Sequence, residues 1–156
     1  MKARIKWNEG VSFVAETGSG HALIIDGAPR NGGRDLGARP MELVLAGAAA
    51  CSAFDVVHIL RKARQPIADC AVEASAERAE QPPQVFTRIR LEFVVAGRGL
   101  DRAQVERAVA LSRDKYCSAT AMLAKTAAIE TVVTVLDADR VPTPTPASGP
   151  TPGGAS

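Results

Sequence analysis

The chain has 156 residues, of which 46% are hydrophobic and 23% charged, and its formal net charge of +2 fits one soluble globular domain. With six aromatic residues (four Phe, one Tyr, one Trp) and no long run of lysine and arginine, the composition excludes base-stacking platforms and basic nucleic-acid-binding arms. The N-terminus lacks the apolar segment of a signal peptide and the longest uncharged apolar run, residues 43–54, is too short to span a bilayer, so we expect a cytoplasmic protein with no nucleic-acid or membrane partner.

Three short strands are predicted at the N-terminus. Residues 2–7 alternate basic with apolar side chains, a period of two that places Ala3, Ile5 and Trp7 on one covered face of a strand. Residues 11–16 and 21–26 follow after glycine-containing turns and are predicted as the second and third strands of a meander. A Gly-rich loop with three arginines, residues 27–39, comes next. It is either a solvated connector or a functional loop.

One long helix is predicted over residues 40–64. Pro40 suits its first turn and Glu42 complements the positive end of the helix dipole. The middle of this helix, "AGAAACSAF", is apolar on all sides, so it must be covered on all sides. One sheet in a domain of this size covers one side only. We therefore predict that a second subunit covers the other side, in an obligate homodimer.

The second half of the domain is predicted as a hairpin, two helices and a strand. The hairpin comprises residues 68–80 and 85–95, with Ile89, Leu91, Phe93 and Val95 on its apolar face. Asp101 is the expected N-cap of a helix over residues 102–114, a short helix follows Cys117, and residues 129–136 form the last strand. The domain thus covers residues 1–140. Residues 141–156 are rich in proline and glycine and predict a disordered tail, with a docking segment as the alternative.

The cysteine spacing argues against a metal or cofactor site. Cys51, Cys70 and Cys117 match no zinc pattern, and the only histidines are His21 and His58, so we expect neither metal nor cofactor. Cys70, on the apolar face of a strand, is interpreted as structural, and His21 as an ordinary strand residue.

Two cysteines remain as candidates for thiol chemistry. On the long helix Cys51 is followed by Asp55 one turn later and by His58 two turns later. His58 is about 10 Å away, too far for a hydrogen bond, and the charge of Asp55 opposes a thiolate. Cys51 is therefore either a structural residue or a thiol activated from elsewhere. Cys117 follows Lys115 near a predicted helix N-terminus, and both features lower the pKa of a thiol.

Three fragments, "RPMELVLAGAAAC", "DVVHIL" and "DKYCS", carry a resemblance to a known family. The chain resembles the OsmC/Ohr family of thiol-dependent peroxidases over residues 1–137, and most closely the YhfA-like branch of predicted redox proteins. The resemblance implies an α+β fold, in which a domain-swapped homodimer wraps antiparallel sheets around two long central helices. It also implies active sites at the subunit interface.

Site roles follow from the same resemblance. Cys51 would be the peroxidatic cysteine, oxidised to a sulfenic acid, and Cys117 the resolving cysteine that condenses with it. A dithiol, typically on a lipoylated protein, would reduce the disulfide. The family glutamate that follows the helix-opening proline is replaced here by Met41, and Glu42 is displaced from it by about 100° around the helix.

The activating arginine lies in the loop before the helix in OsmC-type members of the family. Arg30 and Arg34 are therefore the candidates, and Arg39 is a weaker one.

Two functions are consistent with these features. The first is a hydroperoxide reductase with a two-cysteine disulfide cycle, acting in oxidative-stress defence. The alternative, suggested by the displaced glutamate, is a non-catalytic dimer that binds a small apolar ligand in a cavity lined by the cysteines. A scaffold whose proline-rich tail recruits a partner is a further reading.

Overall fold

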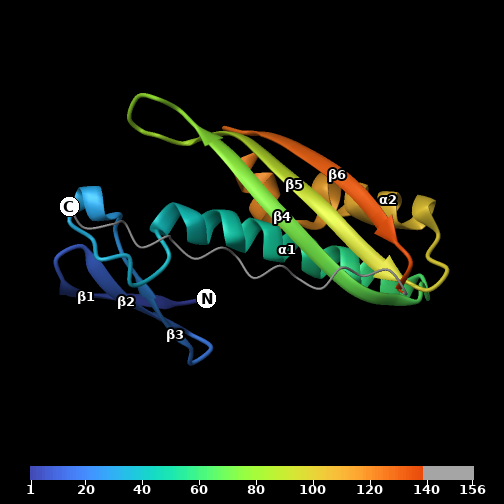
Figure 1. Cartoon of the computed structure of the whole chain (residues 1–156), viewed down its shortest axis with the longest axis horizontal. Coiled ribbons are helices and arrows are strands. Elements are labelled where there is room, and N and C mark those ends of the chain that lie inside the picture. The colour runs from blue at the N-terminus through green and yellow to red at the C-terminus, as the bar shows by residue number, and fades with distance from the viewer. Residues whose placement is uncertain (139–156) are drawn as a thin grey trace, which may run out of the picture.

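The computed structural model describes residues 1–138, and the tail predicted over residues 141–156 lies outside them. The predicted meander is confirmed as an antiparallel sheet of β1 (Ala3–Glu9), β2 (Ser12–Thr17) and β3 (Ala22–Ile25), in the order β1-β2-β3. This sheet lies beyond the N-terminal end of α1, apart from the rest of the chain (Figure 1).

The long helix is confirmed as α1 (Pro40–Lys62). Pro40 occupies its first turn, and the Glu42 carboxylate accepts a hydrogen bond of 2.9 Å from the backbone N–H of Arg39, which satisfies a donor at the helix start. Arg61 and Lys62 lie in the last turn, where positive charge is favourable. The helix therefore begins and ends where its sequence signals place it.

The second sheet contains β4 (Ile67–Arg78), β5 (Phe86–Gly97) and β6 (Ala128–Leu136), in the order β4-β5-β6. The predicted hairpin β4–β5 is antiparallel, but β6 pairs with β5 in parallel, so the expectation of antiparallel sheets is wrong for this strand. The reason is the connection. A crossover through α2 (Arg102–Leu111), a π-helical turn (Ser112–Tyr116) and α3 (Ser118–Leu123) returns the chain to the end of the sheet from which β5 starts.

The core lies between this sheet and the helices. On β5 the predicted alternation is confirmed, since Ile89, Leu91, Phe93 and Val95 are buried. They pack with Val56 and Leu60 of α1 and with Val105 and Val109 of α2 in one cluster. The half-buried face of β4, which includes Cys70 and Val72, packs against the same cluster. One side of α1 is thereby fixed against the sheet.

Apolar surfaces elsewhere stay uncovered within one chain. Ile5 and Trp7 of β1 are 57% and 64% exposed, so the N-terminal face expected to be covered is open. On α1, Val44 and Phe54 are 42% and 71% exposed.

Within residues 1–138, α1 is the one helix apolar and long enough to cross a membrane, with a mean hydropathy of 1.9 over 18 residues. The uncharged run of residues 43–54 within it is shorter than a membrane span. One side of α1 packs against the core, and 28% of this apolar stretch is buried within one chain.

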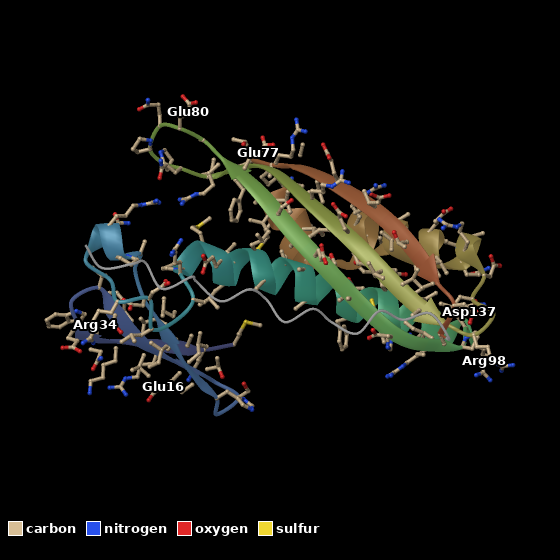
Figure 2. All side chains as sticks on the ribbon, in the orientation of Figure 1. Glu16, Arg34, Glu77, Glu80, Arg98 and Asp137 are labelled. Atoms are coloured by element: carbon tan, nitrogen blue, oxygen red, sulfur yellow. The ribbon has the colours of Figure 1, made fainter. Side chains whose placement is uncertain are left out.

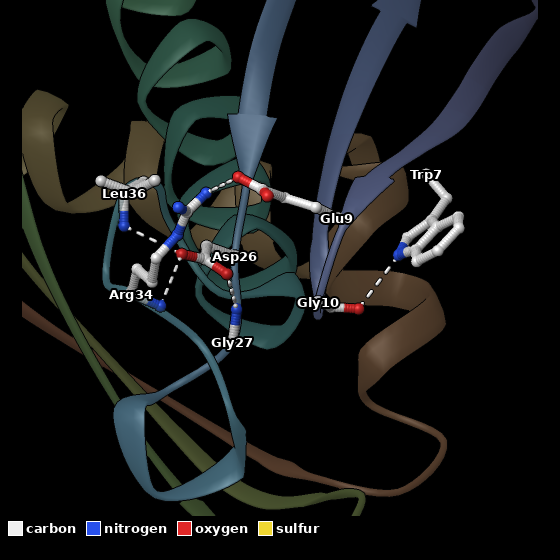
Figure 3. A network of polar contacts seen from close by, with 7 residues as sticks. All are labelled: Trp7, Glu9, Gly10, Asp26, Gly27, Arg34 and Leu36. Carbon is white, nitrogen blue, oxygen red and sulfur yellow. Dashed lines mark hydrogen bonds and ion pairs between the residues drawn. The ribbon is translucent and has the colours of Figure 1, made fainter.

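The Gly-rich loop is organised by Asp26, which is 1% exposed (Figure 3). The Asp26 carboxylate accepts hydrogen bonds from the backbone N–H groups of Gly27, Arg34 and Leu36, at 2.8, 3.0 and 3.0 Å. These bonds hold the pKa of Asp26 below its ordinary value. Glycine is required at Gly33, where a Cβ would overlap the Gly27 carbonyl. The loop that carries the candidate arginines is therefore ordered by one buried carboxylate.

We predict that Asp26→Asn lowers the melting temperature at neutral pH. Because folding depresses the pKa of Asp26, its ionised form stabilises the fold above its ordinary pKa of 3.8, and this contribution is lost as pH falls through the lower folded value. The difference in melting temperature between wild type and variant should therefore shrink in acid. Asp35→Asn, an exposed aspartate in the same loop, is the control. A pH-independent difference for Asp26→Asn would contradict this role.

Candidate functional site

The two candidate cysteines come together although 66 positions separate them in the sequence (117 − 51). The sulfur atoms of Cys51 and Cys117 and a carboxylate oxygen of Asp55 all lie within 4.8 Å of one another. Cys51 and Asp55 come from consecutive turns of α1, and Cys117 from the start of α3. Both thiols are reduced, and Cys117 is 2% exposed whereas Cys51 is partly exposed. A short movement can therefore join the sulfurs.

The position of Cys117 follows from a change of helix type. After α2 the chain forms a π-helical turn, closed by a hydrogen bond of 2.9 Å from the Cys117 N–H to the Ser112 carbonyl. Cys117 then becomes the N-cap of α3, and its sulfur accepts the backbone N–H of Thr120 at 3.5 Å. The prediction that Cys117 lies at a helix start is confirmed. Lys115, however, places its ammonium 5.3 Å from the centre of the Tyr116 ring.

Asp55 belongs to the site, although its charge argued against it in the sequence. The buried Ser112 hydroxyl donates to an Asp55 carboxylate oxygen at 3.1 Å and lies 3.4 Å from the Ser52 carbonyl. The i, i+4 spacing from Cys51 was a visible signal for Asp55. Nothing in the spacing pointed to Ser112, because its place depends on the π-helical turn.

The pKa values of the two thiols are shifted in opposite directions. Burial raises the pKa of Cys51, and the neighbouring Cys117 and the charge of Asp55 add to this increase, against one backbone N–H from Ala119. Burial acts in the same direction on Cys117, but hydrogen bonds from Ser52, Thr120 and Cys51 outweigh it and leave the pKa of Cys117 below its ordinary value. Within one chain the pKa is therefore raised at the partly exposed sulfur and lowered at the buried one.

The candidate arginines lie away from this site in the same chain. Arg34 forms an ion pair with Glu9 (Figure 3), and Figure 2 places it with the N-terminal sheet. Arg30 has no ion-pair partner among residues 1–138 and lines a hollow of about 410 Å³. Arg39 lines the same hollow and pairs with Asp35 and Glu42 at 3.5 and 3.6 Å. Cys51 is eleven residues into α1, or about 16 Å along the helix.

Glu42 and Met41 also lie at the start of α1 rather than at the cysteines. Glu42 caps the helix and pairs with Arg39. Met41 packs its side chain against the core. Neither residue is brought to Cys51 within one chain.

The remaining histidines and Cys70 stay apart from the paired cysteines. His58 stacks on Phe54, with ring centres 6.1 Å apart, and His21 is an exposed residue 3.2 Å from the Ser19 hydroxyl. Cys70 packs against the core, and burial raises its pKa, followed by the charge of Asp69. Both features are those of an inert structural thiol, as interpreted from the sequence.

An apolar hollow of about 430 Å³ runs along α1 beside β4. Its lining includes Leu45, Ala49, Ala53 and Val72, and neither Cys51 nor Cys117 is part of it. Small side chains on this stretch of α1 leave room for another helix or for a small apolar molecule.

Comparison with known proteins matches this arrangement. The family model for OsmC-like proteins matches residues 32–132. Protein YhfA of Escherichia coli K12 is 51% identical over 125 residues, which are 80% of this chain and 90% of YhfA.

Solved structures agree on the fold. A hypothetical protein from Aquifex aeolicus has a TM-score of 0.77 at 28% identity, covering 87% of this chain and 96% of that one. An organic hydroperoxide resistance protein OsmC from Legionella pneumophila, described as a predicted redox protein and regulator of sulfide bond formation, has a TM-score of 0.68 at 20% identity. The alignment covers 86% of this chain and 96% of the Legionella protein, and shows a shared fold.

Burial is the largest cause of the raised pKa of Cys51, and we predict that Cys117 and Asp55 each add to it. Cys117→Ala removes the hydrogen bond and charge that raise the pKa of Cys51, so its alkylation by iodoacetamide should reach half-maximal rate at lower pH. Asp55→Asn should shift the profile in the same direction. All variants carry Cys70→Ser, so that Cys70 adds no signal, and Asp69→Asn is the charge control. An unchanged profile in both test variants would rule out this coupling.

Proposed function

Because the chain belongs to the OsmC-like family, we propose that it is a thiol-dependent hydroperoxide reductase that cycles through a Cys51–Cys117 disulfide. The observation that carries the proposal is the approach of the two sulfur atoms, from separate helices, to within 4.8 Å. A disulfide needs a sulfur separation of about 2.05 Å, so the pair is near bonding range without being bonded. Cys51 is the accessible sulfur and Cys117 is buried behind it.

The reaction balances with these two thiols. The Cys51 thiolate attacks one peroxide oxygen, the O–O bond breaks, and the alkoxide leaves as an alcohol after taking a proton. Cys51 is then a sulfenic acid. Cys117 attacks that sulfur, the S–S bond forms, and the hydroxyl leaves as water with a proton. A dithiol, such as the lipoyl group of a protein, returns two electrons and two protons to both cysteines by thiol–disulfide exchange.

Cys117 is poised for the second step. Hydrogen bonds from Ser52 and Thr120 favour its thiolate, and a thiolate is the form that attacks a sulfenic acid. Cys51, by contrast, needs help for the first step, since its pKa is raised. A cation within a few ångströms lowers the pKa of a thiol by about 1–3 units. Our first candidate is the guanidinium of Arg30 from a second copy of the chain, because Arg30 has no ion-pair partner among residues 1–138. Arg34 is the second, although it already pairs with Glu9.

A homodimer would supply that arginine. Members of the family are typically dimers. In this chain Val44 and Phe54 of α1 and Ile5 and Trp7 of β1 are exposed, and a second copy would cover them. Near the cysteines, Phe54, Tyr116 and Met122 are 71%, 51% and 69% exposed, which suits an apolar organic hydroperoxide at a subunit interface. We place the protein in the cytoplasm, where thiols stay reduced.

A second candidate function rests on the apolar hollow beside α1. A dimer could hold a small apolar ligand there without using the thiols. In that case Cys51→Ser should bind the ligand as well as wild type does. Loss of function in Cys51→Ser would exclude a purely ligand-binding role.

The first test is turnover with its covalent intermediate. With an organic hydroperoxide and dihydrolipoamide, wild type should consume peroxide, and peptide mapping without reductant should recover a Cys51–Cys117 disulfide. Cys51→Ser should abolish both. Cys117→Ser should accumulate a sulfenic acid at Cys51 that dimedone traps, whereas Cys70→Ser should behave as wild type. Absence of both turnover and this disulfide in wild type would refute the proposal.

The second test asks whether Arg30 acts across subunits. Arg30→Ala should lower the rate of Cys51 oxidation by about tenfold or more, because one pKa unit is a factor of ten in thiolate. Refolding Arg30→Ala together with Cys51→Ser gives heterodimers with one complete site. Random pairing in a two-fold dimer should restore about a quarter of wild-type activity.

Arg107→Ala, an exposed arginine on α2, is the matched control and should leave the rate unchanged. If the mixture stays as inactive as its components, the arginine does not act across the interface.

A further inference from the structure

We propose that the reduced site binds one thiophilic divalent cation such as zinc. The ligands are the sulfurs of Cys51 and Cys117 and a carboxylate oxygen of Asp55. The inference comes from the donor set: two sulfurs and one oxygen, from α1 and the start of α3, with all three atoms within 4.8 Å of one another. The zinc patterns expected from sequence are spacings of Cys and His, in which Asp55 has no place.

The spacing of the three atoms suits tetrahedral coordination. Zinc binds thiolate sulfur at about 2.3 Å and carboxylate oxygen at about 2.0–2.2 Å, so donors in one tetrahedral shell lie about 3.4–3.8 Å apart. The donor atoms lie at most 4.8 Å apart, so each pair must approach by at most about 1.4 Å to reach that geometry. Rotation of Asp55 or Cys51 about its side-chain bonds supplies such a movement. Three protein ligands leave the fourth tetrahedral position to water or another ligand, and Cys51 is partly exposed.

Neighbouring groups already form hydrogen bonds with two of the three ligand atoms, as the residues behind metal ligands commonly do. The Ser112 hydroxyl donates to Asp55 at 3.1 Å, and the Thr120 backbone N–H donates to the Cys117 sulfur at 3.5 Å. Hydrogen bonds of this kind orient metal ligands and contribute to affinity. Within residues 1–138, Asp55 has no cationic partner in any ion pair, so its charge is available to a metal ion.

The chemistry of the donors selects the metal. Sulfur ligands favour zinc and cadmium over magnesium and calcium, which prefer oxygen alone. A cation held by both sulfurs would block attack on a peroxide, and a Cys51–Cys117 disulfide would leave it without sulfur ligands. The metal ion and the peroxide thus compete for the same two reduced cysteines. The metal site requires only these reduced cysteines and does not depend on the proposed peroxidase activity.

The test is a titration of reduced, metal-free protein with Cd²⁺, followed by the ultraviolet charge-transfer band of cadmium thiolate. We expect one Cd²⁺ ion to bind per chain, with a charge-transfer band of the intensity of two cadmium–thiolate bonds. The protein should also take one Zn²⁺ ion per chain from a chromophoric chelator. Asp55→Asn should weaken binding by at least about tenfold, and Ser112→Ala by about tenfold, the cost of losing an outer-shell partner. Peroxide-oxidised protein should bind none.

Cys70→Ser and Asp69→Asn are the matched controls and should bind as wild type does. The inference is overturned if reduced protein binds no Cd²⁺, or if Asp55→Asn and Ser112→Ala both keep wild-type affinity. It is also overturned if Cys70→Ser removes the signal, because the ion would then be elsewhere. Peroxide turnover of the same preparation, measured with chelator present, tests the proposed function separately. Binding of the metal ion, with neither turnover nor the Cys51–Cys117 disulfide, would support the metal site and refute the reductase.

Discussion

The contact between α1 and the start of α3 is the constraint on which the site depends. It sets a mid-helix cysteine beside a cysteine at a helix N-cap. Burial would leave either thiol inert by itself. Backbone N–H groups at the start of α3 reach both sulfurs, and the hydrogen bonds to Cys117 make it the more acidic of the two. The pKa shifts of both thiols therefore depend on the pair.

Local signals account for the parts of the structure that were predictable. Pro40 and the basic last turn mark α1, and alternation from Ile89 to Val95 marks the buried face of β5. The parallel pairing of β6 was missed, because strand direction depends on a crossover whose path no local pattern encodes. The effect of Asp55 was predictable, since its charge raises the pKa of Cys51 as the helix spacing implies. The hydrogen bond that Ser112 donates to Asp55 was not, because Ser112 is placed by a π-helical turn that no local pattern encodes.

One chain leaves the proposed chemistry incomplete. The accessible thiol has the higher pKa, and the arginines that resemble the family's activators lie at the far end of α1, in a loop ordered by Asp26. Apolar residues of α1 and β1 are also exposed within one chain. A second copy of the chain would both cover them and bring an arginine to Cys51. Glu42 caps the helix and Met41 packs against the core, so neither residue supplies a charge to Cys51 within one chain.

The most direct test of the account is a crystal structure of the protein after treatment with one equivalent of an organic hydroperoxide. The account predicts electron density for a bond of about 2.05 Å between the sulfurs of Cys51 and Cys117, with α1 and α3 in place. Oxidised Cys51 beside an unbonded Cys117, or two unmodified thiols after peroxide has been consumed, would contradict it.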